Sequence, residues 1–171
     1  MKLIFMGTPD FAVPSLERLL SDGHTVSLVV TQPDKPVGRK QILTPPAVKV
    51  CARAHGLTVY QPTSMRTQEA YDRLKQEEAD AIIVVAYGKI LPKSILELTP
   101  GGCINVHGSL LPRYRGAAPV QWAVINGDAQ AGVTTMLLDE GVDTGDMLLT
   151  LSRPLDDTIT GGELFDMLAA D

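Results

Sequence analysis

The run Asp80-Ala81-Ile82-Ile83-Val84-Val85-Ala86 is a continuous apolar segment bounded by polar and turn-forming residues. An apolar run of this length without polar alternation is typical of a central parallel strand covered on both faces. Such a strand needs helices on either side of its sheet, because both faces must be shielded from water. The segment therefore predicts an α/β fold.

Short strands and helices alternate along the chain on both sides of this run. Further strands are predicted at Lys2–Met6, Thr25–Val30, Leu57–Tyr60, Cys103–Val106 and Val133–Leu138. Helices are predicted at Phe11–Leu20 with Asp10 as N-cap, at Pro45–His55, Gln68–Gln76, Ile90–Leu98 and Ala117–Ile125, and from Gly161 onward. This order predicts an open, mostly parallel, doubly wound (Rossmann-like) sheet with helices on both faces.

The bulk composition suits one globular domain, with 171 residues of which 44% are hydrophobic and 20% charged. The net charge of −5 argues against a generic nucleic-acid coat or a membrane-surface binder, but it leaves room for a local basic patch. No segment approaches the roughly 18 apolar residues of a membrane-spanning helix, and the apolar start at Met1–Gly7 is too short for a signal peptide. We therefore expect a cytoplasmic protein without a membrane segment.

The cysteines and histidines show no metal-binding pattern. Cys51 and Cys103 lie far apart with no partner at ligand spacing, and the three histidines do not cluster. We expect two buried free thiols and no bound metal.

The segment Asn105–Gly116 carries the strongest chemical signal. Asn105 and His107 end an apolar strand and, being two residues apart, point to the same face. Asp143 follows the next apolar run, so we expect its carboxylate at the same edge of the sheet, where ligands bind in α/β folds. Together these groups can stabilise an oxyanion and move a proton. Taken singly, each has an ordinary alternative: a turn cap, a core histidine or a loop acid.

Three other segments are less specific. Gly7-Thr8-Pro9-Asp10 contains one glycine and is not a dinucleotide-binding fingerprint. Tyr87–Gly88 closes the central strand and would let backbone approach a planar ligand. Thr31–Lys49 is a long proline-rich loop whose tip, Gly38-Arg39-Lys40, is either a phosphate contact or a solvated linker.

With these residues in view, the chain resembles the folate-dependent formyltransferases over essentially its whole length. The resemblance rests, in order, on GTPDFAVPSL (7–16), TQPDKPVGRK (31–40), VVAYGKILP (84–92), CINVHGSLLPRYRGAAPVQWAVINGD (103–128) and DEGVDTGD (139–146). The proline-rich basic loop and Tyr87–Gly88 are most similar to the tRNA-directed members of that family.

The resemblance implies a set of site residues. The catalytic residues would be Asn105, His107 and Asp143. Tetrahydrofolate would be bound by Ser109, Leu110, Leu111 and Pro112, and its pterin edge would meet the loops at Tyr87, Gly88 and Asp139. The tRNA acceptor end would meet the loop from about Asp34 to Lys49, through Lys35, Arg39 and Lys40.

The resemblance also implies the reaction and its partners. The formyl donor would be 10-formyltetrahydrofolate, with no metal, and the acceptor would be initiator methionyl-tRNA in translation initiation, with no obligate protein partner. The family's tRNA-directed enzymes carry a small C-terminal β-barrel that residues 1–171 do not include, so we expect a catalytic domain alone. Two alternatives stay open: formylation of a small amine (glycinamide ribonucleotide or an amino sugar), and a non-catalytic folate-binding module.

Overall fold

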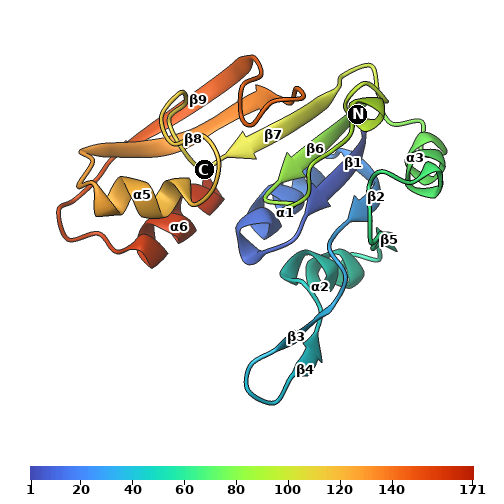
Figure 1. The fold of residues 1–171 in the computed structure, drawn as a ribbon, viewed down its shortest axis with the longest axis horizontal. Coiled ribbons are helices and arrows are strands. Elements are labelled where there is room, and N and C mark those ends of the chain that lie inside the picture. The colour runs from blue at the N-terminus through green and yellow to red at the C-terminus, as the bar shows by residue number, and fades with distance from the viewer.

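The computed structural model describes residues 1–171 and centres on one seven-stranded sheet (Figure 1). Its strands lie in the order β5-β2-β1-β6-β7-β8-β9. Their bounds are β1 Lys2–Gly7, β2 Thr25–Val30, β5 Val59–Tyr60, β6 Ala81–Val85, β7 Cys103–His107, β8 Gln130–Leu137 and β9 Met147–Pro154. All pairs from β5 to β7 are parallel, whereas β8 is antiparallel to both β7 and β9. The predicted mostly parallel sheet is confirmed.

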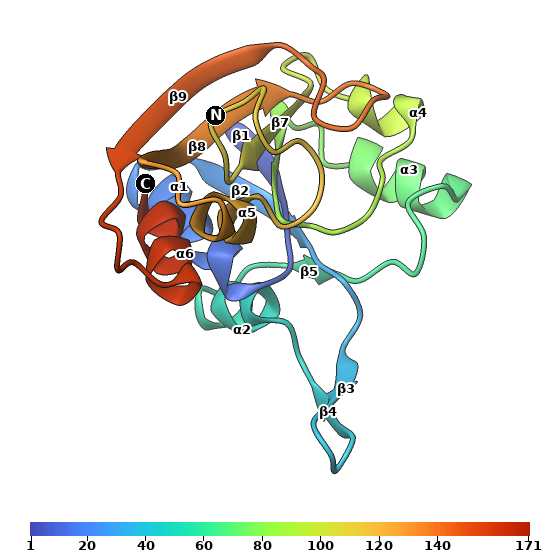
Figure 2. The same cartoon turned by 60° about the vertical axis from the view of Figure 1, so that its left-hand side comes forward.

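Helices cover both faces of this sheet, as the apolar central strands require (Figure 2). The helices are α1 Val13–Ser21, α2 Ala47–Ala54, α3 Gln68–Lys75, α4 Lys93–Leu96, α5 Pro119–Ile125 and α6 Gly161–Ala170. One core cluster joins the sheet to α1, α2, α5 and α6, and a second joins its other face to α3 and α4. Within β1, Ile4 and Phe5 are fully buried on opposite faces and belong to different clusters.

Three local expectations differ from the structure. Asp10 does not cap α1: it begins a short 3-10 helix, Asp10–Ala12, its carboxylate accepts from the N–H of Phe11, and α1 starts only at Val13. The predicted loop Thr31–Lys49 contains an antiparallel hairpin of β3 (Lys35–Val37) and β4 (Ile42–Thr44). Strand β9 was not predicted, because it is an edge strand exposed along its whole length and lacks a buried face.

The two cysteines also differ from one another. Cys103 is buried, as expected, and burial raises the pKa of its thiol to about 12. Cys51 is only partly buried, which corrects the expectation for that residue. No helix in the structure is long and apolar enough to cross a membrane.

Candidate active site

A cavity of about 720 Å³ lies against the end of β7. Four segments supply most of its walls: the turn after β6, the end of β7, the start of α5 and the loop after β8. They bring together the three expected catalytic residues, Asn105, His107 and Asp143, and three of the expected folate-binding residues, Tyr87, Gly88 and Asp139. A volume of this size suits a small organic ligand.

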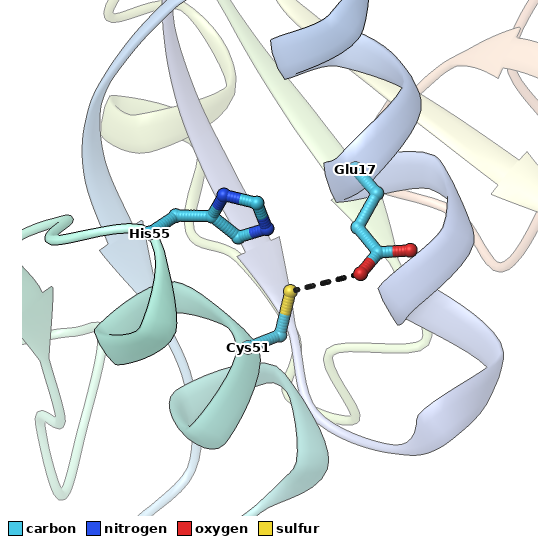
Figure 3. A group of neighbouring side chains, drawn as sticks. All are labelled: Glu17, Cys51 and His55. Carbon is cyan, nitrogen blue, oxygen red and sulfur yellow. Dashed lines mark hydrogen bonds between the residues drawn. The ribbon is translucent and has the colours of Figure 1, made fainter.

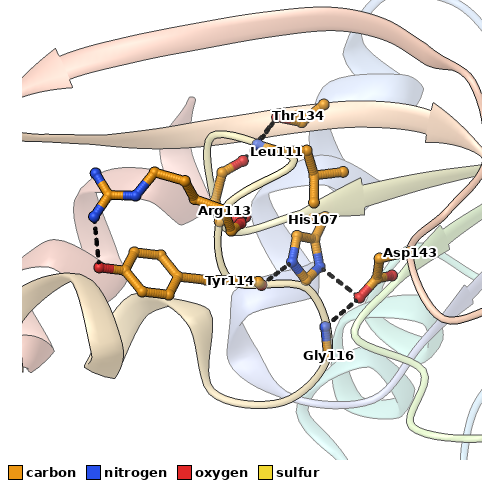
Figure 4. A network of polar contacts seen from close by, with 8 residues as sticks. His107, Leu111, Arg113, Tyr114, Gly116, Thr134 and Asp143 are labelled. Carbon is orange, nitrogen blue, oxygen red and sulfur yellow. Dashed lines mark hydrogen bonds and ion pairs between the residues drawn. The ribbon is translucent and has the colours of Figure 1, made fainter.

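Backbone and carboxylate groups hold the imidazole of His107 from two sides (Figure 4). Its Nε2 lies 2.8 Å from the carbonyl oxygen of Tyr114, and its Nδ1 lies 3.5 Å from Oδ2 of Asp143. A carbonyl oxygen can only accept a hydrogen bond, so Nε2 carries a proton and donates a hydrogen bond to the carbonyl oxygen of Tyr114. Nδ1 is therefore the ring nitrogen that can give or take a proton at the cavity. The residue is 8% exposed, which keeps it within reach of a ligand.

Tyr114 orients this carbonyl through its own side chain. Its hydroxyl donates to Asp128 at 2.7 Å and accepts from Asn126 at 2.9 Å, while its backbone adopts a φ of 55°. A left-handed conformation is unusual for a non-glycine residue and persists where surrounding contacts impose it. No sequence pattern marks Tyr114 as a site residue, because only the folded loop shows where its carbonyl points.

Asp143 reaches His107 by a different route from the one expected. Because β8 is antiparallel to β7, its carboxyl end lies beside Cys103 at the amino end of β7, where the N–H of Leu138 donates to the carbonyl of Cys103. The loop after β8 must therefore fold back over the cavity to bring Asp143 to His107. The N–H of Gly116 fixes it there by donating to Oδ2 at 2.8 Å, and Asp143 has a φ of 50°.

Asp139 lines the cavity but also holds this returning loop together. Its Oδ1 accepts from the N–H of Gly141 at 2.9 Å and from the hydroxyl of Thr144 at 2.7 Å. These bonds stabilise the turn that presents Asp143, so the carboxylate of Asp139 is partly used within the protein.

The segment Ser109–Pro112 lies outside the walls of this cavity. The hydroxyl of Ser109 donates to the carbonyl of Arg113 at 2.6 Å. Thr134 is fully buried and bridges the loop, because its hydroxyl donates to the carbonyl of Ser109 and accepts from the N–H of Leu111, the second of these contacts being drawn in Figure 4. The structure thus places these residues as the framework of the loop that carries Tyr114. Thr134 was missed from sequence because a threonine in an apolar strand gives no distinct signal.

Tyr87 and Gly88 lie in the turn after β6 and form part of the cavity wall. The carbonyl of Tyr87 accepts from Thr8 Oγ1 at 2.9 Å and from Gln32 Nε2 at 2.9 Å. The Tyr87 ring is buried, and this burial raises the pKa of its hydroxyl to about 12, which keeps it neutral. Gly88 has a φ of 78°, a left-handed conformation that glycine adopts without steric strain. Exposed apolar side chains at the cavity, Ile90 and Val142, were not anticipated.

The basic residues Lys35, Arg39 and Lys40 do not line the cavity. They belong to the β3–β4 hairpin, which projects away from the body of the domain in both views (Figures 1 and 2). The structure therefore separates them in space from Asn105 and His107.

One cluster of potential metal ligands lies elsewhere, between α1 and α2 (Figure 3). One ligand atom each from Glu17, Cys51 and His55 lies within 4.8 Å of the others. Glu17 and His55 are exposed, and burial together with Glu17 raises the pKa of the Cys51 thiol, which favours the protonated form that donates to Glu17. None of the three residues lines the cavity, so this cluster is incidental to the site.

A mostly parallel α/β sheet with an amide, an imidazole and a carboxylate around one cavity defines a class of fold and site suited to acyl transfer. The family model described as formyl transferase matches residues 1–170, and the chain belongs to this family.

Two curated relatives carry the same enzyme name. The chain is 57% identical over 171 residues to methionyl-tRNA formyltransferase of Agathobacter rectalis, covering 100% of the chain and 55% of the relative. It is 59% identical to the enzyme of that name from Desulfotalea psychrophila, covering 99% of the chain and 52% of the relative. The chain thus spans about half the length of the curated relatives it matches.

Solved structures confirm the fold. Phosphoribosylglycinamide formyltransferase from Bacillus halodurans matches with a TM-score of 0.79 at 22% identity, covering 99% of this chain and 88% of that one. A sugar N-formyltransferase from a Shewanella species matches with a TM-score of 0.72 at 18% identity, covering 99% and 63%. At these identities the likeness extends to the architecture alone.

Proposed function

We propose that this chain catalyses formyl transfer from 10-formyltetrahydrofolate to the α-amine of initiator methionyl-tRNA, as a catalytic domain acting in the cytoplasm in translation initiation. The arrangement of Asn105, His107 and Asp143 around one cavity carries the chemical part of this proposal. The relatives named methionyl-tRNA formyltransferase, together with the projecting basic hairpin, support the acceptor.

The residues around the cavity fit a folate-sized donor. Its volume of about 720 Å³ lies within the range typical of small-ligand sites, and its walls combine apolar side chains such as Leu91 and Val142 with the peptide groups of Tyr87 and Gly88. The donor supplies a formyl group on N10, which is transferred with tetrahydrofolate as the leaving group. Ser109–Pro112 lie outside the walls of this cavity and shape the loop that follows β7, and their contact with the folate stays a prediction from the family resemblance.

The transfer begins when the neutral α-amine attacks the formyl carbon, forming a C–N bond and placing negative charge on the formyl oxygen. The side-chain amide of Asn105 and a protonated Nδ1 of His107 can donate to that oxygen, and each such donor is worth on the order of 10²–10³ in rate. The 3.5 Å separation between Nδ1 and Asp143 leaves both atoms able to bond to a reactant.

Asp143 handles the proton that is released and taken up during the reaction. Its carboxylate accepts the proton lost by the attacking amine, directly or through water. When the C–N10 bond breaks, Asp143 returns this proton to N10, directly or through water, so that tetrahydrofolate leaves as a neutral amine and the formylated amine is released. The Gly116 N–H, which donates to Oδ2, holds the carboxylate in place during both steps.

Two other functions are less well supported. A small-amine formyltransferase would share the cavity but has no need of a hairpin extending away from it. A non-catalytic folate-binding module would bind the donor without turnover. Incubating the protein with 10-formyltetrahydrofolate and either methionyl-tRNA or free amines separates all three. We expect formylation of methionyl-tRNA, and preferential use of a free amine or binding without turnover would overturn the proposal.

A further inference from the structure

A polar network connects the base of the hairpin to the wall of the cavity. Gln32, which lies between β2 and β3, donates from Nε2 to the carbonyls of Tyr87 at 2.9 Å and Gly88 at 3.3 Å. Its Oε1 accepts from Nζ of Lys35, the first residue of β3, at 2.7 Å. One side chain therefore touches both structures.

Chemistry fixes the orientation of this amide. A lysine ammonium can only donate and a carbonyl oxygen can only accept, so Nε2 must face the Tyr87 and Gly88 carbonyls and Oε1 must face Lys35. The contact also depends on Gly88, because a Cβ at that position would lie 2.5 Å from Gln32 Nε2. The wall and the hairpin base are thus fitted to one another.

Asp34, two residues after Gln32, holds the base of the hairpin through contacts with Lys49 and Gln61. Its carboxylate accepts from Nζ of Lys49 on α2 at 2.7 Å and from Nε2 of Gln61 at 2.8 Å, and the Lys49 side chain is only 8% exposed. Gln61 also donates to the backbone carbonyl of Gln32 at 2.8 Å. The hydrogen bond from Gln61 and, as the next largest cause, the hydrogen bond from Lys49 lower the pKa of the Asp34 carboxyl group. The carboxylate therefore stays charged at neutral pH.

We propose that Gln32 is a positioning residue, which sets the direction of the β3–β4 hairpin relative to the Tyr87–Gly88 wall so that a macromolecular acceptor held by the hairpin presents its amine to the cavity. The part of this inference that concerns the acceptor rests on the proposed function. The part that concerns the hairpin rests on the contacts alone, and the two are tested separately.

The structural part is tested with Gln32→Met, which keeps the side-chain length but removes both hydrogen-bonding ends. Backbone amides at 35–44 should exchange with deuterium about fivefold faster, as expected when a hydrogen bond of ordinary strength is lost. Gln32→Glu should show the same increase, because a carboxylate would face two carbonyl oxygens. Gln76→Met, an exposed glutamine just after α3, is the matched control. Unchanged exchange at 35–44 in both Gln32 variants would overturn the inference whatever reaction the protein catalyses.

The functional part is tested by a double-mutant cycle with Arg39 at the hairpin tip. In Gln32→Met we expect about a tenfold lower kcat/KM for methionyl-tRNA, carried by KM, with donor binding within about twofold of the parent protein. Arg39→Ala should cost less in the Gln32→Met background than in the parent, because a hairpin that has lost its direction makes less use of its tip. Strict additivity, or a loss confined to kcat, would reject the positioning role. Absence of any methionyl-tRNA formylation by the parent would instead reject the proposed function and leave the exchange result standing.

Discussion

The cavity and the β3–β4 hairpin use opposite structural strategies. At the cavity, two of the key polar groups are each held by two partners: His107 by Tyr114 and Asp143, and Asp143 by His107 and Gly116. The hairpin has three paired residues on each strand, and its apolar side chains Ile42 and Leu43 are exposed. Its polar ties to the domain lie at its base.

The proposed function gives a physical reason for this difference. Groups that stabilise developing charge must be held in position before the reaction, because reorganising them would cost part of the benefit they provide. A segment that meets a large charged ligand needs reach and accessible cations instead. We therefore expect substitutions in the cavity to act on rate, and substitutions in the hairpin to act on acceptor affinity.

The largest effect should come from removing an oxyanion donor. His107→Ala and Asn105→Ala should each lower formyl transfer by at least about 10²-fold while leaving folate binding largely intact. Steady-state kinetics with donor titration would measure both quantities, and His55→Ala, an exposed histidine, is the control. Turnover close to that of the parent protein in either cavity variant would contradict the assignment of that residue as an oxyanion donor.

Asp143→Asn should be nearly as damaging, with a loss of about 10²-fold, because it keeps the shape of the side chain but removes the proton acceptor. The pH dependence of kcat/KM, measured for Asp143→Asn and for the parent protein, is the decisive comparison. Asp157→Asn, in the exposed loop after β9, should leave the profile unchanged. The same profile in Asp143→Asn and the parent would show that Asp143 is an ordinary loop acid.

The loop that carries Tyr114 is stabilised by the hydroxyl of Thr134, and removing that hydroxyl should destabilise the protein. Thr134→Val should lower the free energy of unfolding by about 1–3 kcal/mol, because it leaves Ser109 O and Leu111 N without a buried partner. The same change at Thr150, its exposed neighbour on β9, should have little effect. Urea unfolding of the two variants gives the comparison, and equal stabilities would remove Thr134 from the framework of the site.

At the hairpin, Arg39→Ala should reduce the affinity for methionyl-tRNA several-fold without changing donor binding. Losing one phosphate contact should also flatten the dependence of log affinity on log salt by a little under one unit. Arg66→Ala, an exposed arginine outside the hairpin, controls for net charge. An identical salt slope in Arg39→Ala and the parent would make the hairpin a linker and favour the small-amine alternative.

The smallest effect concerns the base of the hairpin and depends on pH. Because the pKa of Asp34 is lowered in the folded state, its contribution to stability is present above the ordinary value of about 4 and is lost as pH falls through the lowered pKa. Asp34→Asn should therefore be less stable than the parent protein at neutral pH, with the gap closing in acid. Thermal unfolding at a series of pH values checks this, and a gap independent of pH would contradict the charged pairing with Lys49.

Much of the fold followed from local patterns. The apolar run at 80–86 predicted a strand buried on both faces, and helical spacing located α2, α3 and α6 to within a few residues. Strand β9 and the hairpin escaped prediction because an exposed strand has no buried face, so its sequence carries no periodic signal. Their pairing partners, rather than their own residues, make them strands.

The site divides in the same way. Sequence alone determined that Asn105 and His107 share one face of a strand, because the alternation of side chains along an extended chain is a local property. Only the tertiary structure decided that Asp143 returns over an antiparallel strand, that the Tyr114 carbonyl fixes the proton on Nε2, and that Gln32 joins the hairpin to the cavity wall. Those contacts join residues distant in sequence or depend on how an irregular loop folds, and no repeating pattern encodes either.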